Sequence, residues 1–224
     1  MGKNTGLSLI LLLLISTVLL FNQSCGTTQE ANFSDHNLEL VIREHINKTE
    51  GPILASELQE FTALSATGRN ITELGGLEHL SNLESLSLAE NNISNVSPLA
   101  SLTNIKTIIL FENQIKDISP LASLDSLSRL HLQGNQIDDI SPLASLNQLY
   151  SLVLSENQVT DISALSSLEK LAILYLRDNH IADISALASL SSLEIVGLEG
   201  NPLNREAINT HIPQLRQRGV EVRW

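Results

Sequence analysis

The chain has 224 residues and a mass of 24.4 kDa, which is enough for one domain with a substantial core. Its formal net charge of -12 repels phosphate backbones and anionic lipid head groups, which disfavours nucleic acid and the bilayer surface as partners. One cysteine excludes a disulfide framework, and the 6 histidines have no metal-ligand spacing, so we expect no cofactor and no metal.

Residues 1–24 predict a secretory signal peptide. Lys3 stands near the start and an apolar run extends from Leu7 to Phe21. At about 15 residues this run is shorter than the ~20 that a membrane-spanning helix needs, which favours cleavage over a retained anchor. We therefore expect the mature chain to leave the cytoplasm.

Cys25, the only cysteine, follows this run after the three residues Asn22, Gln23 and Ser24. It resembles the acylated cysteine of bacterial lipoproteins, and the resemblance implies lipidation at Cys25 and attachment to a membrane through that N-terminal lipid alone. The alternative is a free thiol in a soluble secreted protein. Residues 25–34 are polar and show no periodicity, which is typical of a short tether.

An amphipathic helix is expected at the beginning of the folded body. Leu38, Val41, Ile42 and Ile46 recur at helical spacing and share one face. We interpret residues 35–60 as an N-terminal helical cap.

The body, residues 61–203, consists of about six to seven units with a period of 22. An asparagine marks each complete unit, at Asn91, Asn113, Asn135, Asn157, Asn179 and Asn201. Aliphatic residues keep the same step, as in the column Leu88, Leu110, Leu132, Leu154, Leu176 and Leu198. A degraded earlier unit has Arg69 where the asparagine belongs.

Each half of the unit predicts a local structure. The alternation in Leu86-Ser87-Leu88 indicates a short strand, and the asparagine follows where the chain turns and leaves backbone groups to be bonded. Ser119-Pro120 is typical of a serine cap and a proline at the first position of a tight helical turn. No unit can bury its own leucines, so we expect a solenoid of stacked units.

A second cap is expected at residues 204–224. Apolar residues continue at helical spacing up to Leu215, with Pro213 expected to bend or split the helix. Gly219 predicts a helix stop, and Val220 and Val222 a last strand-like piece. With both ends capped, we expect the chain to be complete.

The repeated pattern LxxLxLxxNxI, followed by segments such as Asp117-Ile118-Ser119-Pro120-Leu121, resembles the leucine-rich repeat and within it the bacterial internalin-like subclass. The resemblance implies an α/β horseshoe with a parallel sheet on its concave side and short 3-10 or helical turns on its convex side. It also implies a surface used to bind other proteins.

Side chains between the buried leucines point out of the sheet and are free of the demands of the core. Those expected to contact a partner are Ile109, Phe111, His131, Val153, Ile173, Tyr175 and Arg177. We expect an apolar stripe rimmed by His131, Arg177 and the acids that precede the asparagines, because binding patches combine an apolar centre with a polar rim. The alternative is that β-formers lie here only because strands favour them.

No pattern of residues indicates catalysis. His131 has no second histidine or cysteine on its own or the next strand, and nucleophile, zinc and phosphate-binding motifs are absent from the sequence. The column Asp117, Asp139, Asp161 and Asp183 suggests a calcium ladder, but capping of the return turns explains it better.

The sequence thus predicts a non-catalytic, monomeric module at the bacterial cell envelope that binds a protein or peptide. The alternative is a structural or adhesive envelope component that binds polysaccharide or neighbouring surface proteins.

Overall fold

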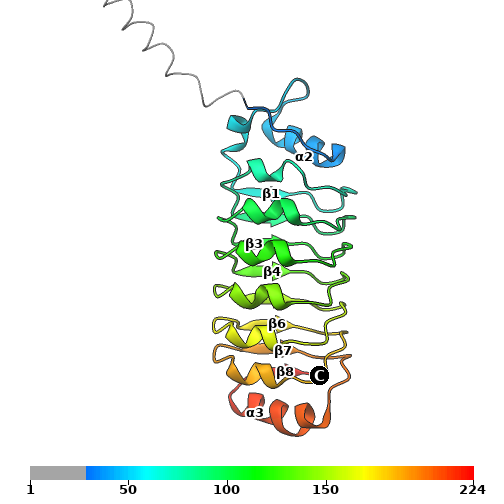
Figure 1. Ribbon diagram of the computed structural model, residues 1–224, viewed down its shortest axis with the longest axis vertical. Helices are drawn as coiled ribbons and strands as arrows, with labels where there is room; N and C mark the ends of the chain where they lie inside the picture. The colour runs from blue at the N-terminus through cyan, green and yellow to red at the C-terminus, as the bar shows by residue number, and fades with distance from the viewer. Residues whose placement is uncertain (1–28) are drawn as a thin grey trace, which may run out of the picture.

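The computed structural model describes residues 29–224, so the expected signal peptide and Cys25 lie outside the described residues. The described chain is an elongated stack of turns, each with one short strand and one tight helix (Figure 1). The predicted solenoid is therefore confirmed. No helix among residues 29–224 combines the length and apolarity that crossing a bilayer would take.

One parallel sheet of 8 strands runs along the stack in sequence order. The strands are β1 Ala63–Ser65, β2 Ser85–Ser87, β3 Thr107–Ile109, β4 Arg129–His131, β5 Ser151–Val153, β6 Ile173–Tyr175, β7 Ile195–Gly197 and β8 Glu221–Arg223. From β1 to β7 each residue pairs with the residue one unit further on, as Leu86 does with Ile108 and Ile108 with Leu130. The sequence period is therefore the register of the sheet.

Tight 3-10 helices form the opposite side of each turn. They are η1 Ala55–Leu58, η2 Leu77–His79, η3 Ser97–Ser101, η4 Ser119–Ser123, η5 Ser141–Ser145, η6 Ser163–Ser167 and η7 Ser185–Ser189. Leu110, Leu121 and Leu132 are fully buried between these helices and the sheet, like the leucines and isoleucines of the other units. The core is thus one continuous aliphatic interior shared by neighbouring turns.

The expectation that a serine side chain caps these helices, as at Ser119, is wrong, whereas the expectation that the aspartate column caps them is confirmed. In η4, the carboxylate Oδ1 of Asp117 accepts the backbone N–H of Ser119 at 2.8 Å, and Asp139 and Asp183 act in the same way in their units. These hydrogen bonds lower the pKa of Asp117, Asp139 and Asp183. The aspartate column is a set of capping groups, because a carboxylate two residues earlier reaches the free N–H better than the serine's own hydroxyl.

The asparagines form a ladder inside the solenoid. Oδ1 of Asn135 accepts the backbone N–H of Ile115 at 2.9 Å, and its Nδ2 donates to the carbonyls of Leu110 and Leu132, both at 3.0 Å. Each asparagine therefore joins its own turn to the preceding one. Arg69 takes the first position of this column, where it reaches back to Glu44 of the cap at 3.3 Å.

The N-terminal cap is the helix α2, His36–Ile46, which covers the first turn (Figure 1). Asp35 caps this helix, since its Oδ1 accepts the N–H groups of Asn37 and Leu38. Its Oδ2 accepts the backbone N–H and the hydroxyl of Thr72, at 2.8 and 3.0 Å, and the N–H of Glu73 at 3.3 Å. One buried carboxylate thus joins the cap to the first turn.

Residues 29–34, expected to belong to the tether, lie against the folded body. The backbone N–H of Ala31 donates to the carbonyl of Ile53 at 2.8 Å, and that of Ser34 donates to the carbonyl of Gly75 at 3.0 Å. The polar composition of residues 29–34 does not predict these contacts, because hydrogen bonds between backbone groups leave no pattern of side chains in the sequence.

The C-terminal cap contains a π-helical turn, η8 Ala207–His211, that passes into α3, Ile212–Gln217, next to Pro213. The expected last strand is β8, which pairs with β7. The backbone groups of Glu221 and Arg223 form hydrogen bonds to the chain of the β7 turn, so the backbone N–H and carbonyl of Val222 between them point to the outer edge of the sheet. There the guanidinium of Arg216 donates to the carbonyl of Val222 at 3.0 Å.

Candidate functional site

What we call the concave face comprises the side chains of β2–β7 that point away from the core, together with the second and third residues after the end of each of these strands. Ile109, His131, Val153 and Tyr175 are partners in consecutive registers, so they form one row across β3–β6. Adjacent members are about 4.8 Å apart along the sheet. Phe111 lies two residues after Ile109, and Ile173 two residues before Tyr175.

The five apolar residues expected to contact a partner form two islands and not one stripe. Ile109 and Phe111 make the first, and Val153, Ile173 and Tyr175 the second; all five are half-buried. Strand β4 separates the islands. Sequence reasoning placed His131 at the rim, but the register puts it between Ile109 and Val153. Arg177 is exposed beyond the second island.

His131 is suited to contact and hydrogen bonding. Burial lowers its pKa, and the positive charge of Arg129 at the start of the same strand lowers it further. The lowered pKa favours the neutral form of the imidazole at pH 7. Across residues 29–224, no group of three or more His, Cys, Asp and Glu side chains is placed to hold a metal ion.

Gly197 is a site residue that the sequence reasoning missed. It is the partner of Tyr175 in the register, and a Cβ at Gly197 would lie 2.9 Å from Cδ1 of the Tyr175 ring. The ring therefore lies over the buried glycine, which has no side chain to displace it. The available signal was a glycine in a strand, where a close approach by another group is a common reason for it.

Acidic residues line the side where the strands end. We call the residue immediately before each ladder position the exit row; its members are Gly68, Glu90, Glu112, Gly134, Glu156, Asp178 and Gly200. All seven have a positive φ, from 52° at Asp178 to 75° at Gly200. Asp178 pairs with Arg177 at 2.7 Å. The exit row forms an acidic border along the concave face.

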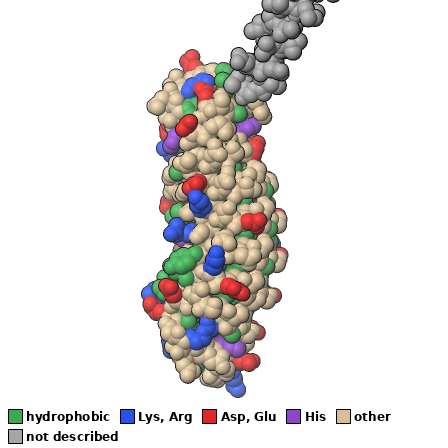
Figure 2. All heavy atoms as spheres, turned by 90° about the vertical axis from the view of Figure 1, so that its left-hand side faces the viewer, with side chains coloured by type: hydrophobic (Ala, Val, Ile, Leu, Met, Phe, Trp, Pro, Cys, Tyr) green, Lys and Arg blue, Asp and Glu red, His purple; other side chains and the backbone are tan. Residues whose placement is uncertain are grey.

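One flank of the molecule carries mixed charge. Figure 2 shows the flank on the left of Figure 1, where acidic and basic side chains are scattered and one hydrophobic group stands out near mid-height. Of the large hydrophobic side chains in residues 29–224, only Leu40, Tyr150 and Trp224 are exposed. These three belong to α2, to the residue before β5 and to the end of the chain, so they form no common patch.

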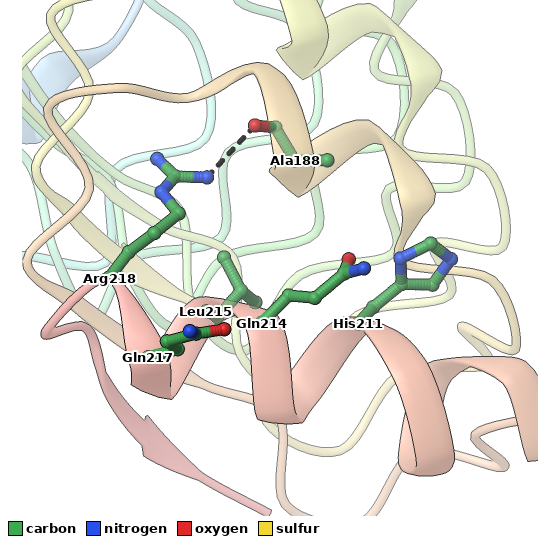
Figure 3. A pocket seen from close by; sticks show the side chains of 6 residues that line it. All are labelled: Ala188, His211, Gln214, Leu215, Gln217 and Arg218. Atoms are coloured by element: carbon green, nitrogen blue, oxygen red, sulfur yellow. Dashed lines mark hydrogen bonds between the residues drawn. The ribbon is translucent and has the colours of Figure 1, made fainter.

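A pocket of about 300 Å³ lies between η7 and the C-terminal cap (Figure 3). Arg218 crosses it and donates to the carbonyls of Ala188, at 2.8 Å, and Leu190. His211 lies at its other side, with Nε2 4.0 Å from Glu206. Because its arginine is already bonded to the backbone, this pocket is a seam that fastens the cap to the last turns.

Comparison with protein families identifies the repeat. The model described as leucine-rich repeats in two copies matches residues 81–123, 103–145, 125–168 and 147–189. The chain is a leucine-rich-repeat protein. Among the curated proteins, none gives a significant match to this leucine-rich-repeat chain.

Solved structures resemble this leucine-rich-repeat protein over most of its length. The internalin inlF of Listeria monocytogenes is 30% identical with a TM-score of 0.71, covering 88% of this chain. A leucine-rich-repeat protein of Leptospira interrogans is 24% identical with a TM-score of 0.61, covering 75% of this chain, and shows the shared fold. The alignments take in 65% of the Listeria chain and 50% of the Leptospira chain.

Proposed function

We propose that this protein is a non-catalytic binding module of the bacterial cell envelope, which recognises a protein or peptide through its concave face. Leucine-rich-repeat solenoids typically act as interaction modules, because stacking the repeats creates an extended surface that is free of the core.

The observation that supports the proposal most is the apolar character of positions where the fold accepts polar residues. Ser87 and Ile109 are register partners, so the same place in the sheet holds a serine in one unit and an isoleucine in the next. Tyr175 takes this place in a later unit, with its ring supported by Gly197. A rigid aromatic group loses little freedom on binding, which suits it to act as an anchor.

The test is a comparison of affinity capture from native envelope by the wild-type chain and by a Phe111→Glu, Tyr175→Glu double variant. We expect the double variant to lose a partner that the wild type retains. Leu40→Glu is the control, because Leu40 is a hydrophobic residue 43% exposed on α2, away from the concave face. Equal recovery of every partner by all three proteins would reject the proposal. Capture of polysaccharide or neighbouring surface proteins that ignores both aromatic residues would favour the structural or adhesive role.

We also propose that Cys25 is acylated and that the lipid holds the protein at the membrane. The support is the position of the only cysteine shortly after the apolar run. A Cys25→Ser variant should move from the membrane fraction to the soluble fraction. A Ser24→Ala variant is the control and should remain with the membrane. Unchanged membrane association of Cys25→Ser would reject acylation.

A further inference from the structure

We propose that the partner of the concave face is a polypeptide that presents lysine or arginine side chains beside its apolar contacts, and that these basic groups bind the exit row around Gly134. This inference rests on the proposed function and adds to it the charge of the partner. It depends on the placement of two carboxylates, on the residues that the fold accepts in the exit row, and on the acids of the row that form no ion pair within the described residues.

The carboxylates of Glu112 and Glu156 lean toward the turn between them. A Cβ at Gly134 would lie 2.5 Å from Oε1 of Glu112, so this carboxylate occupies the space that a side chain at Gly134 would need. From the other side, Oε1 of Glu156 accepts the amide of Gln133 at 3.2 Å. The Glu112 carboxylate of one neighbouring unit thus lies over Gly134, and the Glu156 carboxylate of the other unit is held at the preceding residue, Gln133.

The fold does not require acids in the exit row. Glycine, the residue that a left-handed backbone favours, occupies the row at Gly68, Gly134 and Gly200. Glu112 and Glu156 adopt the same conformation, with φ of 53° and 57°, although side chains disfavour it. Their charge is therefore a property of the surface and not of the folding of the turn.

Three of the four acids in the row form no ion pair within the described residues. Among the ion pairs formed by residues 29–224, Asp178 has a basic partner, whereas Glu90, Glu112 and Glu156 have none. The described residues also offer no cluster that could bind a metal ion. A lysine or arginine from another polypeptide is the cation that this border accommodates.

The apolar islands explain why the basic group should come with apolar neighbours. Phe111 directly precedes Glu112, so a partner atom in contact with Phe111 is one residue away from the carboxylate. The aliphatic stem of lysine or arginine can lie along such an apolar surface while its charged end reaches the acid. Charge complementarity of this kind sets specificity and the association rate.

The experiment is a selection of random displayed peptides on the purified chain, followed by affinity measurements on the enriched peptides. The test variant is Glu112→Gln with Glu156→Gln, which keeps the size of both side chains and removes their charge. The control is Glu169→Gln with Glu194→Gln, which removes the same charge from two exposed acids that lie outside the exit row, one between η6 and β6 and one directly before β7. The Phe111→Glu, Tyr175→Glu variant identifies peptides that use the concave face.

We expect peptides enriched in lysine or arginine next to aromatic or aliphatic residues. The test variant should bind them about tenfold more weakly, and the control should bind them like wild type. Peptides that depend on Phe111 and Tyr175 but bind both glutamine variants equally would overturn this inference and leave the proposed function standing. If no enriched peptide depends on those two aromatic residues, the proposed function fails and this inference with it.

Discussion

The interior of the solenoid and its concave face are built from the same units, but only the interior repeats. Every ladder asparagine bonds its own turn and the preceding one in the same way, and the surrounding leucines are buried throughout. On the concave face, the register row that contains Ser87 passes through isoleucine, histidine, valine and tyrosine. The comparison indicates that periodic positions maintain the fold, whereas aperiodic positions are available for recognition. Four substitutions test this division, beginning with the largest expected effect.

Asn135→Ala should lower the free energy of unfolding by about 3 kcal/mol, because it leaves the Ile115 N–H and the carbonyls of Leu110 and Leu132 without their partner inside the solenoid. Urea denaturation followed by circular dichroism measures the change. Gln136→Ala, at the exposed next position, is the control and should change stability by less than about 0.5 kcal/mol. Equal stability of the two variants would contradict the role of the ladder.

Asp35→Asn should lower stability at neutral pH by about 2 kcal/mol, since the carboxylate joins α2 to Thr72 and Glu73. Burial raises the pKa of Asp35, but the hydrogen bonds from Thr72, Leu38 and Glu73 outweigh it and leave the pKa below its usual value. The stabilisation is therefore present above the unfolded-state pKa, about 4, and is lost as the pH falls through the lower folded-state pKa. The stabilities of the wild type and the Asp35→Asn variant should therefore converge in acid. A Glu50→Gln control should have the stability of the wild type at every pH, and unfolding curves measured across the pH range test both.

Gly197→Ala should lower stability by about 1 kcal/mol, because the added methyl group forces the Tyr175 ring to move. In a Tyr175→Ser background the same change should have almost no effect. A double-mutant cycle measures the difference as a coupling energy between the two positions. A coupling energy near zero would show that the ring is not supported by the glycine.

Glu112→Gly should raise the free energy of unfolding by about 0.5 kcal/mol, because glycine adopts the left-handed backbone without strain. The gain is small because glycine also makes the unfolded chain more flexible. Gln114→Gly, where φ is not positive, should instead lower stability. Thermal unfolding should then show a higher melting temperature for Glu112→Gly and a lower one for Gln114→Gly than for the wild type. A loss of stability in both would place the acids of the exit row among the residues that the fold needs.

Much of the fold is predictable from the sequence because the stacking of the units repeats one set of contacts. The period places Leu110, Asn135 and Ile115 correctly without any knowledge of distances. The sequence offers two side chains for the capping of a return helix, since Ser119 and Asp117 are both good caps, and only the backbone geometry decides for Asp117. The backbone hydrogen bonds of Ala31 and Ser34 are not predictable either, because they involve no side chain and leave no pattern in the sequence.

The candidate site is less predictable, because its chemistry depends on neighbours in adjacent turns. The sequence indicates that Ile109 and Tyr175 face outward, and their contact with a partner stays a prediction. It does not indicate that Tyr175 lies over Gly197, or that Glu112 leans across Gly134. Side-chain rotamers set these contacts, and the repeat imposes no pattern on them.

Arg216 has a consequence for how molecules of this protein behave when concentrated. An unpaired strand at the end of an open sheet invites another chain to add itself, and repetition of that step leads to aggregates. Here the guanidinium already holds the carbonyl of Val222 on the outer side of β8, so an incoming strand would have to displace a charged donor before it could pair. A single side chain thereby helps to give a structure of repeated units a definite length.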